Sequence, residues 1–127
     1  ITGHLIKKFG YSNIMYIGVL FYLITIILSL FEQTFVNYFI SLVFLGVGWN
    51  FLFISGTSLV VLTYKEEEKF RVQGINDLIV FSTMALASLS AGILLSLTSW
   101  MIMHLICIPL LILIVYSTFR ADSLTNK

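Results

Sequence analysis

Four long apolar stretches alternate with short polar segments along this sequence. The apolar stretches cover residues 13–31, 38–62, 75–97 and 100–119. They contain about 19, 25, 23 and 20 residues, so as helices that rise about 1.5 Å per residue they would span roughly 28 to 38 Å. That length is enough to cross a hydrocarbon core of about 30 Å. A helix pairs its own backbone groups inside lipid, and the polar alternation of membrane strands is not visible. The pattern therefore predicts an all-α membrane protein with four transmembrane helices.

The composition supports a lipid environment. Of the 127 residues, 59% are hydrophobic and 10% are charged, whereas about a quarter of the residues in soluble domains are charged. The mean hydropathy is +1.04. A soluble fold of this size leaves much of its surface exposed, so it could not hide this much apolar surface from water. We therefore expect a multi-pass protein of the cell membrane, with the lipid bilayer as its main partner.

Few residues are suited to catalysis or to metal binding. Cys107 is the only cysteine, which leaves no pair for an internal disulfide and no zinc site of the usual spacing. No nucleophile–base pair, carboxylate dyad or Gly-x-x-x-x-Gly-Lys-Ser/Thr loop is found. With a net charge of +1 and no basic cluster, nothing indicates a nucleic-acid partner. We expect no enzyme activity, no cofactor and no metal site.

The basic residues predict the orientation in the membrane. They precede the first stretch, lie between the second and third, and follow the fourth: Lys7, Lys8, Lys65, Lys69, Arg71, Arg120 and Lys127. The other two connections contain none. Because cytoplasmic loops carry the excess of Lys and Arg, we expect both termini and the middle connection in the cytoplasm.

Small and polar residues are distributed unevenly among the four stretches. Residues 38–62 and 75–97 are rich in Gly, Ala, Ser, Thr and Asn, which allow close helix packing and hydrogen bonds across helices. Residues 13–31 and 100–119 contain few. We therefore expect the second and third helices to be central and the other two to face lipid. In a self-contained bundle every helix would need an inward face, so a bundle with only two interior helices lacks partner helices. Together with a start at Ile1, this predicts a chain that continues upstream.

Two motifs resemble the major facilitator superfamily. The segment Gly3-His4-Leu5-Ile6-Lys7-Lys8-Phe9-Gly10 is similar to its loop signature Gly-x-Leu-x-Asp-Arg/Lys-x-Gly, with Lys7 in place of Asp. The run Gly48-Trp49-Asn50-Phe51, followed by Gly56-Thr57, together with residues 64–73 and Asn76-Asp77, resembles helices ten and eleven of a bacterial subfamily. The resemblance implies helices nine to twelve of a twelve-helix transporter, so that residues 1–127 would form a partial C-terminal transmembrane domain whose partners are the missing N-terminal helices.

Candidate solute-binding residues lie on the second and third helices. Gly46, Asn50 and Thr57 fall on roughly one face of the second helix, and Ser88 belongs to a small-residue stripe on the third. An amide in hydrocarbon needs a partner or a water-filled cavity. Asn50 could therefore contact a solute or form an interhelical hydrogen bond, while Trp49 could line a cavity or simply pack.

Further candidates belong to a gate or to the loop motif. The motif candidates are Gly3, Lys8 and Gly10, and the gate candidates are Arg71 and Asp77. Asp77 could instead cap the start of the third helix, with Asn76 as the alternative cap.

The leading functional hypothesis is a secondary transporter that moves a small-molecule solute by alternating access. A stand-alone four-helix exporter is the first alternative, although such proteins resemble this one only in length. They depend on an embedded acid in the first helix, and none occurs here before Glu32. A non-transporting scaffold subunit is the second alternative.

Overall fold

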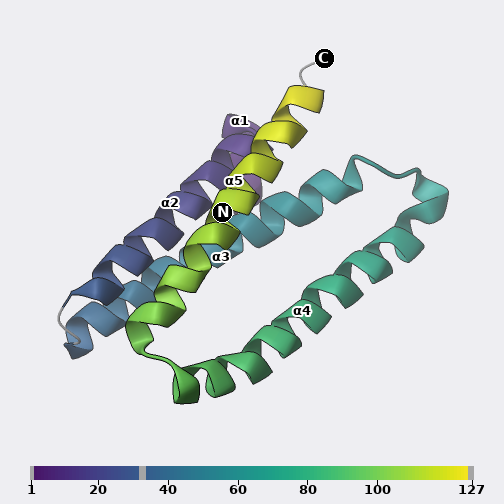
Figure 1. Ribbon diagram of the computed structural model, residues 1–127. Coiled ribbons are helices and arrows are strands. Elements are labelled where there is room, and N and C mark those ends of the chain that lie inside the picture. The colour runs from purple at the N-terminus through teal and green to yellow at the C-terminus, as the bar shows by residue number, and fades with distance from the viewer. Residues whose placement is uncertain (1, 32–33, 126–127) are drawn as a thin grey trace.

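The computed structural model describes residues 2–31 and 34–125, and these form helices joined by short connections (Figure 1). The elements are α1 (Thr2–Phe9), α2 (Tyr11–Leu30), α3 (Phe35–Val61), the 3₁₀ turn η1 (Glu66–Glu68), α4 (Lys69–Leu97) and α5 (Trp100–Thr125). The four long helices are each long and apolar enough to cross a membrane. The prediction of an all-α membrane protein with four transmembrane helices is confirmed.

The helices extend beyond the apolar stretches at several ends. The loop-motif segment forms the short helix α1, and α4 begins at Lys69 rather than near residue 75. Asp77 is thus the ninth residue of α4, so the prediction that Asn76 or Asp77 caps this helix is wrong. The cause is the segment 69–74, which has no apolar signature but is helical and continues α4 toward the α3–α4 connection.

The tightest contact joins α2 to α3 and depends on two glycines. A Cβ atom added to Gly18 would lie 3.1 Å from the Gly48 carbonyl oxygen, and one added to Gly48 would lie 3.0 Å from the Gly18 carbonyl oxygen. Further along the same interface, the Thr25 hydroxyl donates to the Phe21 and Ser41 carbonyls at 3.0 and 3.3 Å. Small residues thus bring the two backbones together, as in other membrane helix pairs.

The structure corrects the expected position of the first transmembrane helix. α2 was predicted to face lipid, but it lies between α3 and α5. Its buried residues recur on one face: Ile14, Gly18, Val19, Thr25, Ile26 and Ser29. Val19 and Ile26 pack against Leu111 of α5, and the Ser12 hydroxyl donates to Asp122 at 2.9 Å near the other end of α5. The small residues of α2 are few, but their helical spacing places them together.

α4 stands apart from the other helices (Figure 1), and none of its residues is buried. Its small-residue stripe is exposed at Ser88, Gly92 and Ser96, and a Cβ atom added to Gly92 would meet nothing within 4 Å. The prediction that this helix is central is not met within the described residues. Small residues of this kind allow close helix packing, but no described helix packs against this face of α4.

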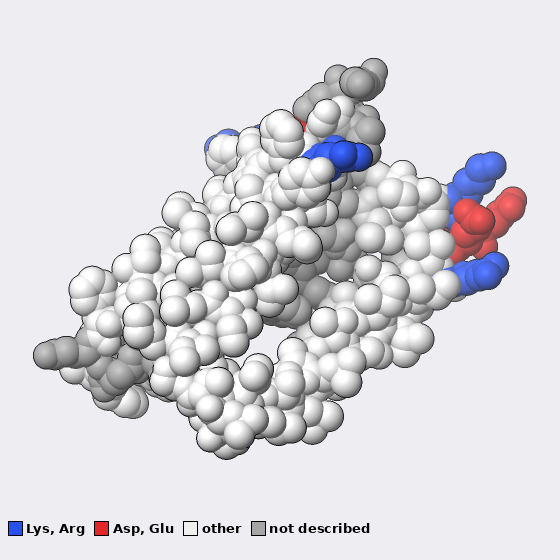
Figure 2. All heavy atoms as spheres, in the orientation of Figure 1, with Lys and Arg blue, Asp and Glu red and all other residues white. Residues whose placement is uncertain are grey.

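Charged residues gather at one end of the helices. Figure 2 shows the Lys, Arg, Asp and Glu side chains of this face along the upper and right-hand edges, near α1, the α3–α4 connection and the end of α5. The opposite end, where α4 turns into α5, is uncharged in this view. The described charges are therefore arranged as expected for one side of a membrane.

Candidate functional site

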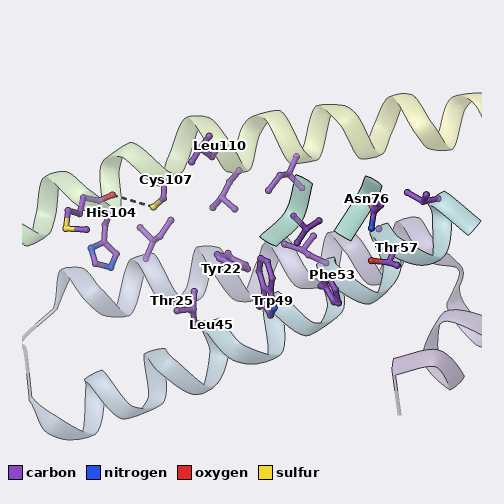
Figure 3. Close-up of a pocket in the computed structure, with 18 residues that line it drawn as sticks. Tyr22, Thr25, Leu45, Trp49, Phe53, Thr57, Asn76, His104, Cys107 and Leu110 are labelled. Atoms are coloured by element: carbon purple, nitrogen blue, oxygen red, sulfur yellow. Dashed lines mark hydrogen bonds between the residues drawn. The ribbon is translucent and has the colours of Figure 1, made fainter. Parts of the chain in front are cut away.

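A cavity of about 740 Å³ lies between α4 and the packed group of α2, α3 and α5 (Figure 3). All four transmembrane helices contribute to its wall, and most of the exposed atoms there are apolar. Its lining residues are Tyr22, Thr25, Ile26, Leu45, Trp49, Leu52, Phe53, Gly56, Thr57, Val60, Asn76, Val80, Met103, His104, Cys107, Leu110, Leu111 and Ile114. Its volume falls within the range of small-molecule sites, roughly 300 to 1,000 Å³.

Aromatic side chains form the middle of the cavity wall. Trp49 and Phe53 lie one turn apart on α3, and their rings stack with centroids 5.7 Å apart and an interplanar angle of 14°. Tyr22 of α2 lies beside Trp49 in Figure 3. Trp49 is 39% exposed, which leaves part of the indole accessible from the cavity. The wall thus offers a fixed, flat aromatic surface.

Polar groups lie toward the two ends of the cavity. At one end are His104 and Cys107 of α5, and the Cys107 thiol donates to the Met103 carbonyl at 3.4 Å (Figure 3). At the other end Thr57 of α3 and Asn76 of α4 lie near each other in the same view. An apolar middle with polar ends suits a solute that has a flat apolar part and polar substituents.

The candidate binding residues predicted from the sequence do not all lie in the cavity wall. Thr57 lines the cavity, but Gly46, Asn50 and Ser88 do not. The Asn50 side-chain oxygen accepts a hydrogen bond of 2.6 Å from the Thr2 hydroxyl of α1, on the side of α3 that faces α1. Ser88 lies on the exposed surface of α4. The prediction that these four residues contact a solute stays a prediction.

The loop-motif residues shape the joint between α1 and α2. Gly10 has a φ angle of +84°, a backbone conformation that glycine adopts without steric cost. The Asn13 amide donates to the Phe9 carbonyl at 2.9 Å. The Lys8 ammonium lies 5.2 Å from the centre of the Phe9 ring, while Gly3 is exposed with open space around it. Gly10 is therefore required for the turn that aligns α2.

The gate candidates lie on the exposed first turns of α4. Arg71 and Asp77 are both exposed, and the Asn76 amide donates to the Asp77 carboxylate at 3.4 Å. Nearby, the Gln73 amide donates to the Tyr64 hydroxyl at 2.7 Å, which ties α4 to the end of the α3–α4 connection. A gate role for Arg71 and Asp77 stays a prediction.

The sequence alone left open whether Trp49 lines a cavity or packs, and the structure places it in the cavity wall, where it also stacks on Phe53. The signal was its position: it is the fifteenth of 27 residues in α3, far from the membrane interfaces where tryptophan is usually enriched. Among the described residues, no group of three or more His, Cys, Asp or Glu side chains could hold a metal ion.

Comparison with known proteins identifies the family to which this chain is similar. The model of the Major Facilitator Superfamily matches residues 1–126. The riboflavin transporter RfnT of Brucella anthropi is 35% identical over 113 residues, which cover 89% of this chain. The chain spans 28% of the length of that relative. No solved structure matches the chain.

Proposed function

This chain belongs to the major facilitator superfamily, and we propose that it forms helices nine to twelve of a secondary transporter that moves a small solute by alternating access. In transporters of this kind two halves rock around a site near the middle of the membrane. The missing N-terminal helices of the same protein would then be its partners. The chain spans 28% of the RfnT sequence, a share that fits four helices of a longer transporter.

The observation that carries the proposal is the cavity shared by all four transmembrane helices. A scaffold subunit would need no hollow lined by Trp49, Thr57 and His104. The exposed polar face of α4 also supports the proposal, because in a transporter that face would meet another helix or the solute path.

For the solute, we propose riboflavin or a compound with a similar fused ring. The support is the name of the relative, a riboflavin transporter, and the aromatic middle of the cavity. A fused ring could lie against Trp49 while a hydroxylated chain reaches toward Thr57 and Asn76, or toward His104.

For the orientation, we propose that both termini and the α3–α4 connection face the cytoplasm. The support is the placement of the described basic residues at one end of the helices. Lys127 lies outside the described residues.

An uptake assay tests the proposed function. The complete transporter, produced in cells that cannot make riboflavin, should restore growth on low external riboflavin and saturable uptake of labelled riboflavin. Dissipating the ion gradients should show whether uptake is coupled to them. Cells with an empty vector are the control, and uptake no greater than in that control would exclude riboflavin as the solute.

A further inference from the structure

We propose that Trp49, held by Phe53, is the stacking surface on which this cavity binds a planar heteroaromatic ring. The inference rests on the proposed transport function and deepens it, because it assigns recognition of the solute ring to one side chain. Nothing in the name of the relative says where or how its solute is bound.

The first support is the fixed orientation of the indole. The Phe53 ring lies nearly parallel to it, with an interplanar angle of 14° and a centroid distance of 5.7 Å. These residues are four apart on α3, where side chains of one helix face meet. A ring already held in place loses little further freedom when a solute stacks on it, so more of the contact energy remains for binding.

The second support is the surroundings of Trp49. It lies in the middle turns of α3, it is 39% exposed, and it lines the cavity. A tryptophan that served only to anchor the helix would lie at the interface with the headgroups. One that served only to pack would have its rings covered. Trp49 stacks on Phe53 but keeps part of its surface exposed in the cavity wall.

The third support is the distribution of polarity along the cavity. The wall around Trp49 is mostly apolar, with the Tyr22 ring beside the indole, and the polar side chains Thr57, Asn76 and His104 lie toward the ends of the cavity (Figure 3). A sugar or an ion would find few partners beside the indole. A fused aromatic ring bearing polar groups at its margins would match both parts of the wall.

Binding to the purified complete transporter in lipid nanodiscs tests the inference. The probes are riboflavin and lumiflavin, which share the fused ring but differ in the hydroxylated chain. Stacking of a base on an aromatic side chain corresponds to roughly a fivefold to 150-fold effect on affinity. Trp49→Leu should therefore weaken binding of both probes by about fivefold or more. Trp49→Phe, which keeps an aromatic ring, should weaken it less.

Phe39→Leu is the matched control, because Phe39 is an exposed aromatic residue of α3 outside the cavity. Its affinity for both probes should equal that of the unaltered protein. If Trp49→Leu binds as tightly as the control, the inference is overturned. If Trp49→Leu does not fold, the affinity of Trp49→Phe for the two probes is the test instead. Reduced affinity of Trp49→Phe would support the inference, and unchanged affinity would overturn it.

Cys107 gives a second readout that needs no substitution. This thiol lines the same cavity and is exposed, so a small maleimide should modify it, and bound lumiflavin should slow that modification. Peptide mass spectrometry locates the modified residue. A Cys107 that never reacts would mean that another helix fills the cavity, which would also overturn the inference. Uptake of riboflavin with no effect of Trp49→Leu on binding would leave the proposed function standing and reject only the inference.

Discussion

Asn50 has a protein partner, and this determines what its substitution should do. Its side-chain oxygen accepts the 2.6 Å hydrogen bond from the Thr2 hydroxyl, which joins α1 to α3. Breaking such a bond costs about 1 kcal/mol in the free energy of unfolding. Asn50→Ala and Thr2→Val should each lower stability by about that amount. The double variant should be little less stable than either single variant, because both remove the same bond. Denaturant unfolding of the three variants measures this coupling.

Transport kinetics distinguish a structural role of the Asn50–Thr2 hydrogen bond from the solute contact that the sequence suggested for Asn50. If Asn50 acts only through Thr2, uptake normalised to folded protein should be equal in Asn50→Ala and Thr2→Val. A rise in apparent KM in Asn50→Ala alone would instead place its amide in the solute path.

The residues of the cavity wall could be foreseen only in part from the sequence. Thr57 was identified because a hydroxyl among small residues suits a polar site. Trp49 was left between cavity lining and packing, because both require the same residue type, and only the neighbouring helices decide between them. Asn50 and Trp49 are adjacent and so point about 100° apart on the helix. Which of the two directions faces the cavity depends on the neighbouring helices and cannot be read from α3 alone.

At the scale of the elements, the α2–α3 pair depends on the absence of side-chain atoms at Gly18 and Gly48. A Cβ atom at residue 48 would lie 3.0 Å from the Gly18 carbonyl oxygen and 3.0 Å from a Tyr22 ring carbon. Because the carbonyl belongs to the backbone of a packed helix, the helices must separate to accept it. Gly48→Ala should lower the free energy of unfolding by about 1 to 3 kcal/mol.

Gly46→Ala is the matched control for Gly48→Ala. Gly46 lies two residues away on the same helix, and a Cβ atom there would meet nothing within 4 Å. Since alanine favours a helix over glycine by up to about 1 kcal/mol, Gly46→Ala should leave stability unchanged or raise it. Thermal unfolding in one detergent compares the two. Equal stability of both variants would mean that the close contact of α2 and α3 does not exist in solution.

The number and type of the long helices followed from the sequence, but their packing did not. Length and hydropathy identify a membrane helix because a helix pairs its own backbone groups inside lipid, and the alternation of a membrane strand is absent from these stretches. The prediction for α2 was wrong because it counted small residues and ignored their spacing: Gly18, Thr25 and Ser29 lie on one face and are all buried. α1 was missed because residues 2–9 are too few and too charged to carry an apolar signature.

For the whole molecule, the proposed orientation predicts which connections meet the outside. In a complete transporter without other reactive cysteines, Ser99→Cys should react with an impermeant thiol reagent added to intact cells. Ser99 joins α4 to α5 at the end of the helices where no described residue is charged. Glu67→Cys, in the charged α3–α4 connection, should react only after the cells are opened. Labelling of residue 67 in intact cells would reverse the orientation.

The uneven packing of the four helices predicts how this chain behaves by itself. α2 lies between α3 and α5, whereas α4 has no buried residue and stands beside the cavity. Helices associate in membranes through close packing and hydrogen bonds, and α4 makes little of either. The α2–α3 pair should therefore persist in the isolated chain, while the position of α4 should not be fixed.

Two measurements on the purified chain in detergent test this difference. A disulfide between Thr25→Cys and Ser41→Cys, whose parent side chain and carbonyl lie 3.3 Å apart, should form readily because it joins the packed pair. Light scattering after size exclusion should show association that grows with concentration, since the exposed small-residue face of α4 can pair with another copy. Heating should give a broad transition, because few contacts couple α4 to the rest. A monodisperse monomer that unfolds in one sharp step would contradict the prediction. It would mean that α4 closes onto α2, α3 and α5 without the helices proposed to accompany it.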